Sequence, residues 1–213
     1  MRSFFNPDNW FWRGFGRFAD YFILSMMWMV CCVPLVTAGT ASIALYDTVA
    51  HCLRYQDDTL ARRFFSTFKK ELLRGVLLTL LWAVVCYLLN VGYQIICQLG
   101  GGDAAWTVFS IVYFVTLFVP LGVICWAVAL ESRFAYRFGE LHKTALAFTF
   151  AHLPQTAAIV VIFVVVLNVV INFPFFVMIL PAAMAHLQSV FIEKVFAKYM
   201  PEEEETEIAE IEA

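Results

Sequence analysis

The stretch "VPLVTAGTASIALYDTVAHCLRY", residues 33–55, decides how many times this chain crosses a membrane. It begins like the end of one apolar helix, passes Gly39, and then places Asp47 and His51 one helical turn apart in apolar sequence. Pro34 weakens continuation of the first helix, and Gly39 supplies a permissive backbone for a turn. The stretch therefore predicts a helical hairpin that turns at residues 37–39.

The composition excludes the class of soluble globular proteins. Of the 213 residues, 62% are hydrophobic, whereas ordinary soluble domains contain about 45–50% apolar residues. Four windows contain no Lys or Arg, namely residues 76–97, 104–130, 155–171 and 173–192. A helix that crosses a membrane needs about 20 predominantly apolar residues. We therefore expect an all-α, polytopic transmembrane helical bundle.

The positions of the fourteen basic residues predict six spans. If residues 40–55 cross the bilayer, both termini and all fourteen bases lie on one side, which the positive-inside rule assigns to the cytoplasm. If they do not cross, the first three bases move to the opposite side. The second span is short, because sixteen residues rise about 24 Å and the hydrocarbon core is about 30 Å thick. A re-entrant helix therefore stays open as an alternative. The predicted spans are 20–37, 40–55, 75–98, 105–130, 153–171 and 173–192, and Pro120 and Pro181 interrupt the fourth and sixth.

The predicted domain organisation is one transmembrane domain, residues 1–200, followed by an acidic tail. The tail "PEEEETEIAEIEA", residues 201–213, contains seven Glu and no base. Of the seventeen acids, ten are therefore left for residues 1–200, against fourteen bases, a net charge of +4. Such a block of like charges predicts a disordered, solvated segment.

Aromatic and basic residues are mixed in three places, as is typical of helices at the membrane interface. The stretch "FFNPDNWFWRGFGRF", residues 4–18, predicts an amphipathic helix, and the spacing Arg63-Phe64-x-x-x-Phe68 recurs at Arg133. We expect these helices to lie on the cytoplasmic surface, where they anchor in lipid or bind a partner such as a transport ATPase. The candidate lipid or partner interface comprises Arg13, Arg17, Arg63, Phe64, Phe68, Lys69, Arg133, Phe134 and Phe138.

Ionisable residues inside predicted spans are costly and are therefore candidate functional residues. Asp47 and His51 share a helix face by their i,i+4 spacing. They are suited to handling a proton or cation, or to holding the short helix in the bundle by hydrogen bonding. Amides at the same spacing occur in the third and fifth spans, where such groups commonly link helices. The candidate intramembrane polar site comprises Asp47, His51, Asn90, Gln94, Asn168 and His186.

Recognised enzyme motifs are absent from the sequence. It contains no H-E-x-x-H, no G-x-S-x-G, no P-loop and no His/Cys cluster with metal-ligand spacing. We therefore expect no enzymatic activity, no cofactor, no metal and no nucleic-acid partner. The expected partners are the lipid bilayer, and either a second copy of the chain or the subunits of a transporter.

Two stretches carry a family resemblance: "CCVPLVTAGTASIALY", residues 31–46, and "RRFFSTFKKE", residues 62–71. With their surroundings, residues 28–75, they resemble the YesL-like family of bacterial integral membrane proteins. The resemblance implies a plasma-membrane protein of largely uncharacterised function, often encoded beside oligosaccharide-uptake transporters. It implies no functional residues.

The function that we expect is therefore a non-enzymatic, accessory or regulatory role in bacterial carbohydrate uptake, in the plasma membrane with both termini in the cytoplasm. The alternative is a small channel or proton-coupled carrier with an intramembrane polar path.

Overall fold

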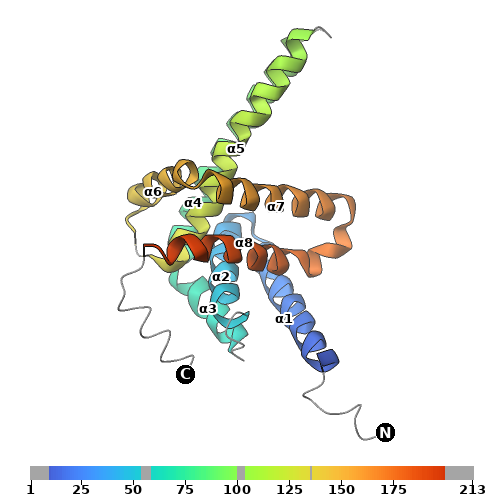
Figure 1. Cartoon of the computed structure of the whole chain (residues 1–213), viewed down its shortest axis with the longest axis vertical. Helices are drawn as coiled ribbons and strands as arrows, with labels where there is room; N and C mark the ends of the chain where they lie inside the picture. The colour runs from blue at the N-terminus through green and yellow to red at the C-terminus, as the bar shows by residue number, and fades with distance from the viewer. Residues whose placement is uncertain (1–9, 54–58, 100–103, 135, 200–213) are drawn as a thin grey trace, which may run out of the picture.

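A computed structural model describes residues 10–53, 59–99, 104–134 and 136–199, and within these ranges all regular secondary structure is helical. The predicted tail, residues 201–213, lies outside the described residues. Figure 1 shows the arrangement of the helices. Their bounds are α1 Trp10–Cys31, η1 Leu35–Thr37, α2 Ala38–Thr48, η2 Val49–Leu53, α3 Leu60–Lys70, α4 Leu72–Leu99, α5 Ala104–Arg133, α6 Phe138–Ala151, α7 Leu153–Asn172, η3 Pro174–Met178 and α8 Leu180–Phe196.

Three segments of the described residues are long and apolar enough to cross a membrane: Leu72–Ile95 in α4, Val115–Arg133 in α5, and Leu153–Asn172, which is α7. They coincide with three of the six predicted spans, whereas six spans are not confirmed. The outer faces of α4 and α7 expose aliphatic side chains such as Leu88 and Val161. Large uncovered apolar surfaces of this kind mark contact with lipid or with another protein.

The N-terminal segment differs from the prediction. A separate surface helix over residues 4–18 and a span over residues 20–37 were expected, but α1 runs continuously from Trp10 to Cys31. The chain then turns, and the Thr37 hydroxyl donates hydrogen bonds to the carbonyls of Cys31 (2.6 Å) and Pro34 (2.7 Å). The predicted hairpin is therefore present, with its turn at residues 32–37.

The short helix α2 lies at the centre of the molecule. Its eleven residues pack against α1, α3, α4, α5 and α8, and its side chains from Ile43 to Thr48 are buried. It continues into η2, a π-helical turn over Val49–Leu53. Such π-turns are rare and occur frequently at functional sites.

Close contact between α2 and α4 depends on two glycines. The Gly39 amide donates to Thr79 Oγ1 at 2.8 Å, and the Thr40 hydroxyl donates to the carbonyl of Leu72 at 3.2 Å. A Cβ atom at Gly75 would lie 2.5 Å from the Thr40 Cα. The absence of a side chain at Gly39 and at Gly75 therefore allows the two backbones to touch. The start of α2 lies against the first two turns of α4.

In the C-terminal half, α7 and α8 run side by side and across the direction of α5 (Figure 1). Trp126 of α5 is fully buried beneath them, and its indole N–H donates to Thr156 Oγ1 at 3.0 Å. The predicted interruption at Pro181 takes the form of a helix start, because Pro181 occupies the first turn of α8, where a missing N–H costs nothing. Pro120 lies inside α5, which continues past it.

Candidate functional site: a charged cavity between α2, α3 and α5

Asp47 is the centre of the first polar cluster. Its carboxylate is almost fully buried and accepts two hydrogen bonds from one guanidinium, from Arg63 Nε at 3.0 Å and from Arg63 Nη2 at 3.1 Å. The Thr67 hydroxyl donates a third at 2.7 Å. Such bidentate, charge-assisted bonds are the strong class of hydrogen bonds. They tie the end of α2 to the middle of α3.

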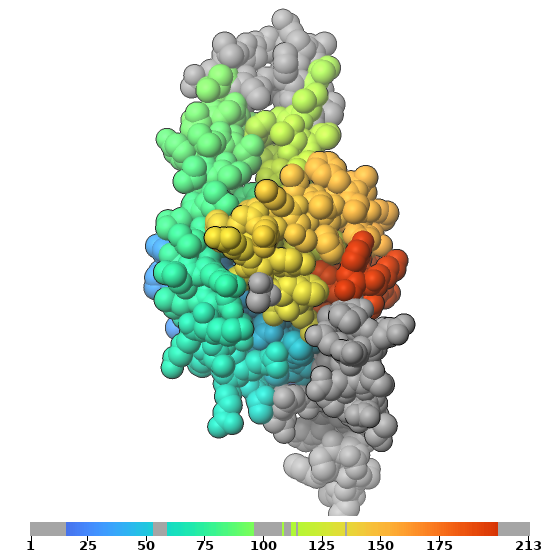
Figure 2. Space-filling view, turned by 90° about the vertical axis from the view of Figure 1, so that its left-hand side faces the viewer, coloured from blue at the N-terminus to red at the C-terminus, as the bar shows by residue number. Residues whose placement is uncertain are grey.

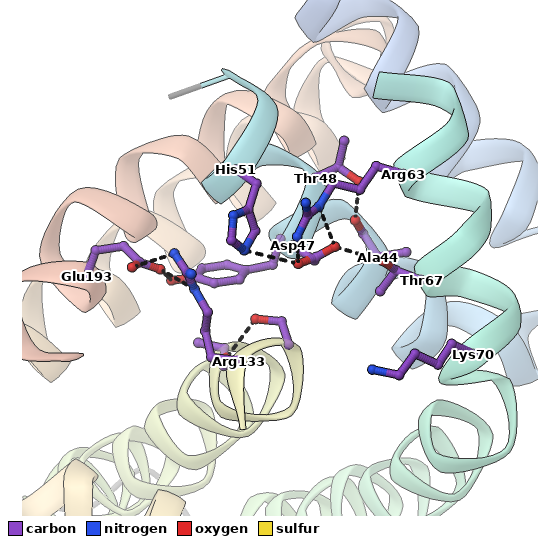
Figure 3. A network of polar contacts seen from close by, with 12 residues as sticks. Ala44, Asp47, Thr48, His51, Arg63, Thr67, Lys70, Arg133 and Glu193 are labelled. Atoms are coloured by element: carbon purple, nitrogen blue, oxygen red, sulfur yellow. Dashed lines mark hydrogen bonds and ion pairs between the residues drawn. The ribbon is translucent and has the colours of Figure 1, made fainter. Parts of the chain in front are cut away.

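A second buried ion pair lies on the other side of His51, between α5 and α8. Arg133 Nη2 donates to Glu193 Oε2 at 2.7 Å, and Arg133 Nε donates to Oε1 at 3.3 Å. The hydroxyl of Tyr46 donates to Glu193 Oε1 at 3.4 Å. Tyr46 and Asp47 are neighbours on α2, so this helix contacts both ion pairs, whose four charged residues are labelled in Figure 3.

A third cluster surrounds Arg74 at the start of α4. Its Nη1 atom lies 3.1 Å from Glu131 Oε1 and 4.0 Å from Glu71 Oε2. The ammonium group of Lys70 lies 3.3 Å from Glu71 Oε1, while the Lys70 side chain is 82% exposed. Figure 3 shows Lys70 reaching from α3 toward the space between α3 and α5.

The three clusters enclose a cavity of about 330 Å³. Three acids and three fixed bases line it, together with an imidazole, two hydroxyls and one aromatic ring. The lining residues are Asp47, His51, Arg63, Thr67, Lys70, Glu71, Glu131, Ser132, Arg133 and Phe134. Its formal charge is balanced, so the cavity is strongly polar without being strongly acidic or basic.

His51 faces this cavity from η2, outside the three helices that are long enough to cross a membrane. Burial, together with the positive charges of Arg133 and Arg63, lowers the pKa of His51 from 6.5 to about 4, and the Asp47 carboxylate only partly opposes this. The imidazole is therefore neutral at neutral pH. Its Nε2 atom lies 3.6 Å from Asp47 Oδ1, which is too long for a good hydrogen bond. Asp47 is held by Arg63 and Thr67 rather than by His51.

The other members of the predicted intramembrane site do not join Asp47 and His51. Gln94 donates to Asn90 Oδ1 at 3.0 Å, and both side chains are exposed on α4. Asn172 donates to the carbonyl of Asn168 at 2.8 Å, again on an exposed surface. The amide pairs therefore form within single helices, and none of these four residues lines the charged cavity.

The remaining candidate, His186, belongs to the contact between α1 and α8. Its ring meets the ring of Tyr21 edge to face, with centroids 5.9 Å apart. Its neighbour Gln188 is buried and donates to the carbonyl of Ile159 at 3.1 Å. Gln188 lines a second cavity, apolar and about 460 Å³ in volume, between α2, α4, α5, α7 and α8. His186 lines neither cavity.

Most of the predicted interface residues on α3, at the end of α5 and at the start of α6 turn inward. Phe64 is fully buried, Phe68 packs against it with ring centroids 6.3 Å apart, and Arg63 is held by Asp47. Phe134 and Phe138 pack against the core, and Arg133 binds Glu193. Most of the contacts of these residues are therefore made within the protein, although Arg63 remains 37% exposed in its side chain. Arg17 and Lys69 are exposed, and the Arg13 side chain lies outside the described side chains.

A different face of α3 is exposed. It carries Arg62, Phe65, Ser66, Lys69 and Lys70, and Phe65 is 47% exposed. In Figure 2 this helix lies on the surface below α4. The aromatic and basic character expected of an interface is present there, on the side of the helix opposite Phe64 and Phe68, and the predicted residue Lys69 belongs to it.

Sequence reasoning missed several residues that complete the site. They are Glu131, Glu193, Glu71, Arg74 and Thr67, none of which was a candidate site residue. Their separation from Asp47 along the chain hides the association, because no local spacing connects α2 with α5 and α8. The one available signal was that Glu131 and Glu193 follow long apolar windows.

Comparison with known families places this site partly inside a matched segment. Residues 21–93 match the family described as "Protein of unknown function, DUF624". The match encloses residues 28–75, which carry the YesL-like resemblance, and it contains Asp47 and Arg63. The α5 and α8 sides of the site lie beyond it. No curated protein and no solved structure matches the chain.

Proposed function

We propose that this protein is a non-enzymatic accessory or regulatory component of bacterial carbohydrate uptake, and that it binds a transporter subunit through the outer face of α3. The observation that carries the docking role is the exposed strip of Arg62, Phe65 and Lys69 on a helix whose other face is fixed. Aromatic residues and Arg are enriched at protein interfaces. The link to carbohydrate uptake comes from the YesL-like resemblance.

The inner face of α3 makes this strip a rigid platform. Arg63 is clamped by Asp47, and Phe64 is fully buried against α1 and α2. A docking helix that is ordered before binding loses less conformational entropy when the partner arrives. The buried ion pair therefore supports binding without contacting the partner.

We place the protein in the bacterial plasma membrane with α3 and both termini on the cytoplasmic side. The bases at residues 62–74 precede α4, and those at residues 133–143 follow α5. A hairpin of α4 and α5 that crosses twice puts both basic segments on one side, as the positive-inside rule favours. The hairpin of α1 and α2 then enters from the cytoplasmic side and returns to it without crossing.

The docking role is tested by purification from native membranes in mild detergent. The wild-type chain should retain a sugar-transporter subunit, identified by mass spectrometry, and the double variant R62E/K69E should lose it. The control variant Lys194→Glu changes an exposed base on α8 and should retain the subunit. Equal retention by R62E/K69E, or no transporter subunit with the wild type, contradicts the proposal.

The second candidate, a channel or proton-coupled carrier, is favoured by one observation, the contact of Asp47 and His51 with a polar cavity. Asn90 and Asn168, which were expected to extend the path, do not line that cavity. In proteoliposomes a carrier would show a pH-dependent flux that Asp47→Asn abolishes while folding is kept. Absence of flux with the wild type removes this candidate.

A further inference from the structure

The ionised groups that line the charged cavity are already paired with one another. Asp47 is bound by Arg63, Arg133 by Glu193, Glu131 by Arg74, and Glu71 by Lys70. An ion that entered would have to displace one of these partners or bring an uncompensated charge beside buried carboxylates. Breaking a pair whose carboxylate is buried is strongly unfavourable, and the four carboxylate side chains are at most 9% exposed, although Lys70 itself is 82% exposed. The cavity is therefore poorly suited to an anion or a cation.

The same groups keep hydrogen-bonding capacity that the pairing does not use. A guanidinium has five N–H donors, and Arg63 uses its Nε and Nη2 groups on Asp47. A carboxylate has about four acceptor sites, and Glu131 accepts one hydrogen bond, from Arg74, among the described residues. The Ser132 hydroxyl donates to the carbonyl of Ala129 at 2.7 Å, which leaves its lone pairs as acceptors. Unused donors and unused acceptors are therefore both present in the cavity lining.

From this arrangement we propose that the cavity between α2, α3 and α5 binds a small, uncharged, hydroxyl-rich molecule of the size of a monosaccharide or cyclitol. Each hydroxyl group both donates and accepts, so it can bridge a paired guanidinium and a paired carboxylate without separating them. The ring of Phe134 supplies an apolar wall for the C–H face of such a molecule.

The volume limits the size of the ligand. Pockets for small molecules span about 300–1,000 Å³, and this cavity, about 330 Å³, lies at the lower end. One ring fits that range better than an oligosaccharide chain. With α3 on the cytoplasmic side, the ligand is a solute of the cytoplasm. The inference goes beyond the docking role and stands if no transporter partner is found.

The test uses the purified full-length chain in mild detergent and measures affinity by isothermal titration calorimetry. The neutral probes are D-glucose and myo-inositol, and the charged probes of similar size are glucuronate, glucosamine and inorganic phosphate. At least one neutral probe should bind at least about tenfold more tightly than every charged probe. Equal or tighter binding of a charged probe, or no binding of either neutral probe, overturns the proposal.

Two variants locate the binding site. Ser132→Phe fills the cavity and should weaken binding of the neutral probe by at least about tenfold. Ser66→Phe makes the same change on the exposed face of α3 and should leave the affinity unchanged. If Ser132→Phe does not fold, Phe134→Leu serves in its place, because it removes the aromatic wall with little change of volume. Unchanged affinity in the folded cavity variant overturns the assignment.

Discussion

The side chain of Asp47 carries a buried negative charge, and its effect on the stability of the fold depends on its hydrogen-bonding partners. Removing one member of a buried pair leaves the other group uncompensated, which costs about 3–5 kcal/mol in a fully buried site. Arg63 is 37% exposed in its side chain, so water can solvate its guanidinium when the carboxylate is lost. The Thr67 hydroxyl would lose its acceptor in the same step. The cost should therefore lie below the fully buried range.

For Asp47→Ala we expect a loss of about 2–3 kcal/mol in the free energy of unfolding. Thermal unfolding in detergent at fixed lipid content provides the measurement. A double-mutant cycle with Arg63→Ala should show that the two losses are not additive, because both variants remove the same pair. Additive losses would mean that Asp47 and Arg63 act independently, against the geometry.

The lowered pKa of His51 predicts a pH-dependent stability. The unfolded chain takes up a proton on this residue below pH 6.5, while the folded chain does so only near about pH 4. The unfolded state therefore binds more protons in this window, and stability is lost as the pH falls from 6.5 toward about 4. Above 6.5 the contribution is constant.

We expect the wild type to lose more thermal stability than His51→Gln between about pH 7.5 and about pH 5, because the variant has no imidazole to charge. Differential scanning fluorimetry in detergent measures both midpoints. At the higher pH the wild-type imidazole is neutral, so the difference between the two midpoints at that pH serves as the reference. Parallel pH profiles for the two proteins would show that His51 titrates normally in the fold.

At the scale of the element, α3 shows what sequence patterning can and cannot predict. The spacing of its aromatic and basic residues correctly indicates an amphipathic helix. It cannot say which side faces inward, because Arg63 and Arg62 have the same chemistry, and so do Phe64 and Phe65. The choice is made by Asp47, sixteen residues earlier, and by the apolar surface against which Phe64 packs. Tertiary partners of this kind leave no local signal.

The contact of α2 with α4 gives a prediction at the same scale. Gly75→Ala places a Cβ atom 2.5 Å from the Thr40 Cα and 2.6 Å from its backbone nitrogen, so the helices must separate. We expect a loss of about 1–3 kcal/mol, the usual cost of overpacking. Gly92→Ala lies on the same helix with no atom within 4 Å and should be neutral or stabilising by up to about 1 kcal/mol. The measurement is the thermal unfolding midpoint of each variant. Equal midpoints would contradict the close contact between α2 and α4 at Gly75.

At the scale of the whole molecule, hydropathy predicted where the helices lie in the sequence better than how deeply each one enters the membrane. The all-helical fold and three helices long and apolar enough to cross a membrane follow from long apolar windows, because only helices and closed barrels satisfy their backbone in lipid. The window that contains α2 is also largely apolar, yet α2 packs against five other helices, and its side chains from Ile43 to Thr48 are buried within the protein. A sequence does not distinguish an apolar residue that faces protein from one that faces lipid. The number of membrane spans could therefore not be derived from composition.

The contacts of α2 set the depth of the N-terminal hairpin. α4 is 28 residues long, which corresponds to about 42 Å. The start of α2 contacts residues 72–79 of α4, a segment of about 10 Å at the N-terminal end of that helix. In the proposed topology, with this end of α4 on the cytoplasmic side, the turn at residues 32–37 does not reach the far surface. The hairpin is then the re-entrant arrangement that the sequence left open, with the N-terminus on the cytoplasmic side.

Cysteine labelling in intact cells tests this topology, in a background in which all six native cysteines are replaced. Leu35→Cys places a thiol on the turn, where the native side chain is 80% exposed, and Asp103→Cys places one between α4 and α5. A membrane-impermeant maleimide added from outside should label position 103 and leave position 35 unlabelled, while both should react after the cells are opened. Labelling of both positions from outside would mean that α1 and α2 cross the bilayer completely. In that case the re-entrant arrangement is wrong, and α1 and α2 form two further spans, as the sequence predicted.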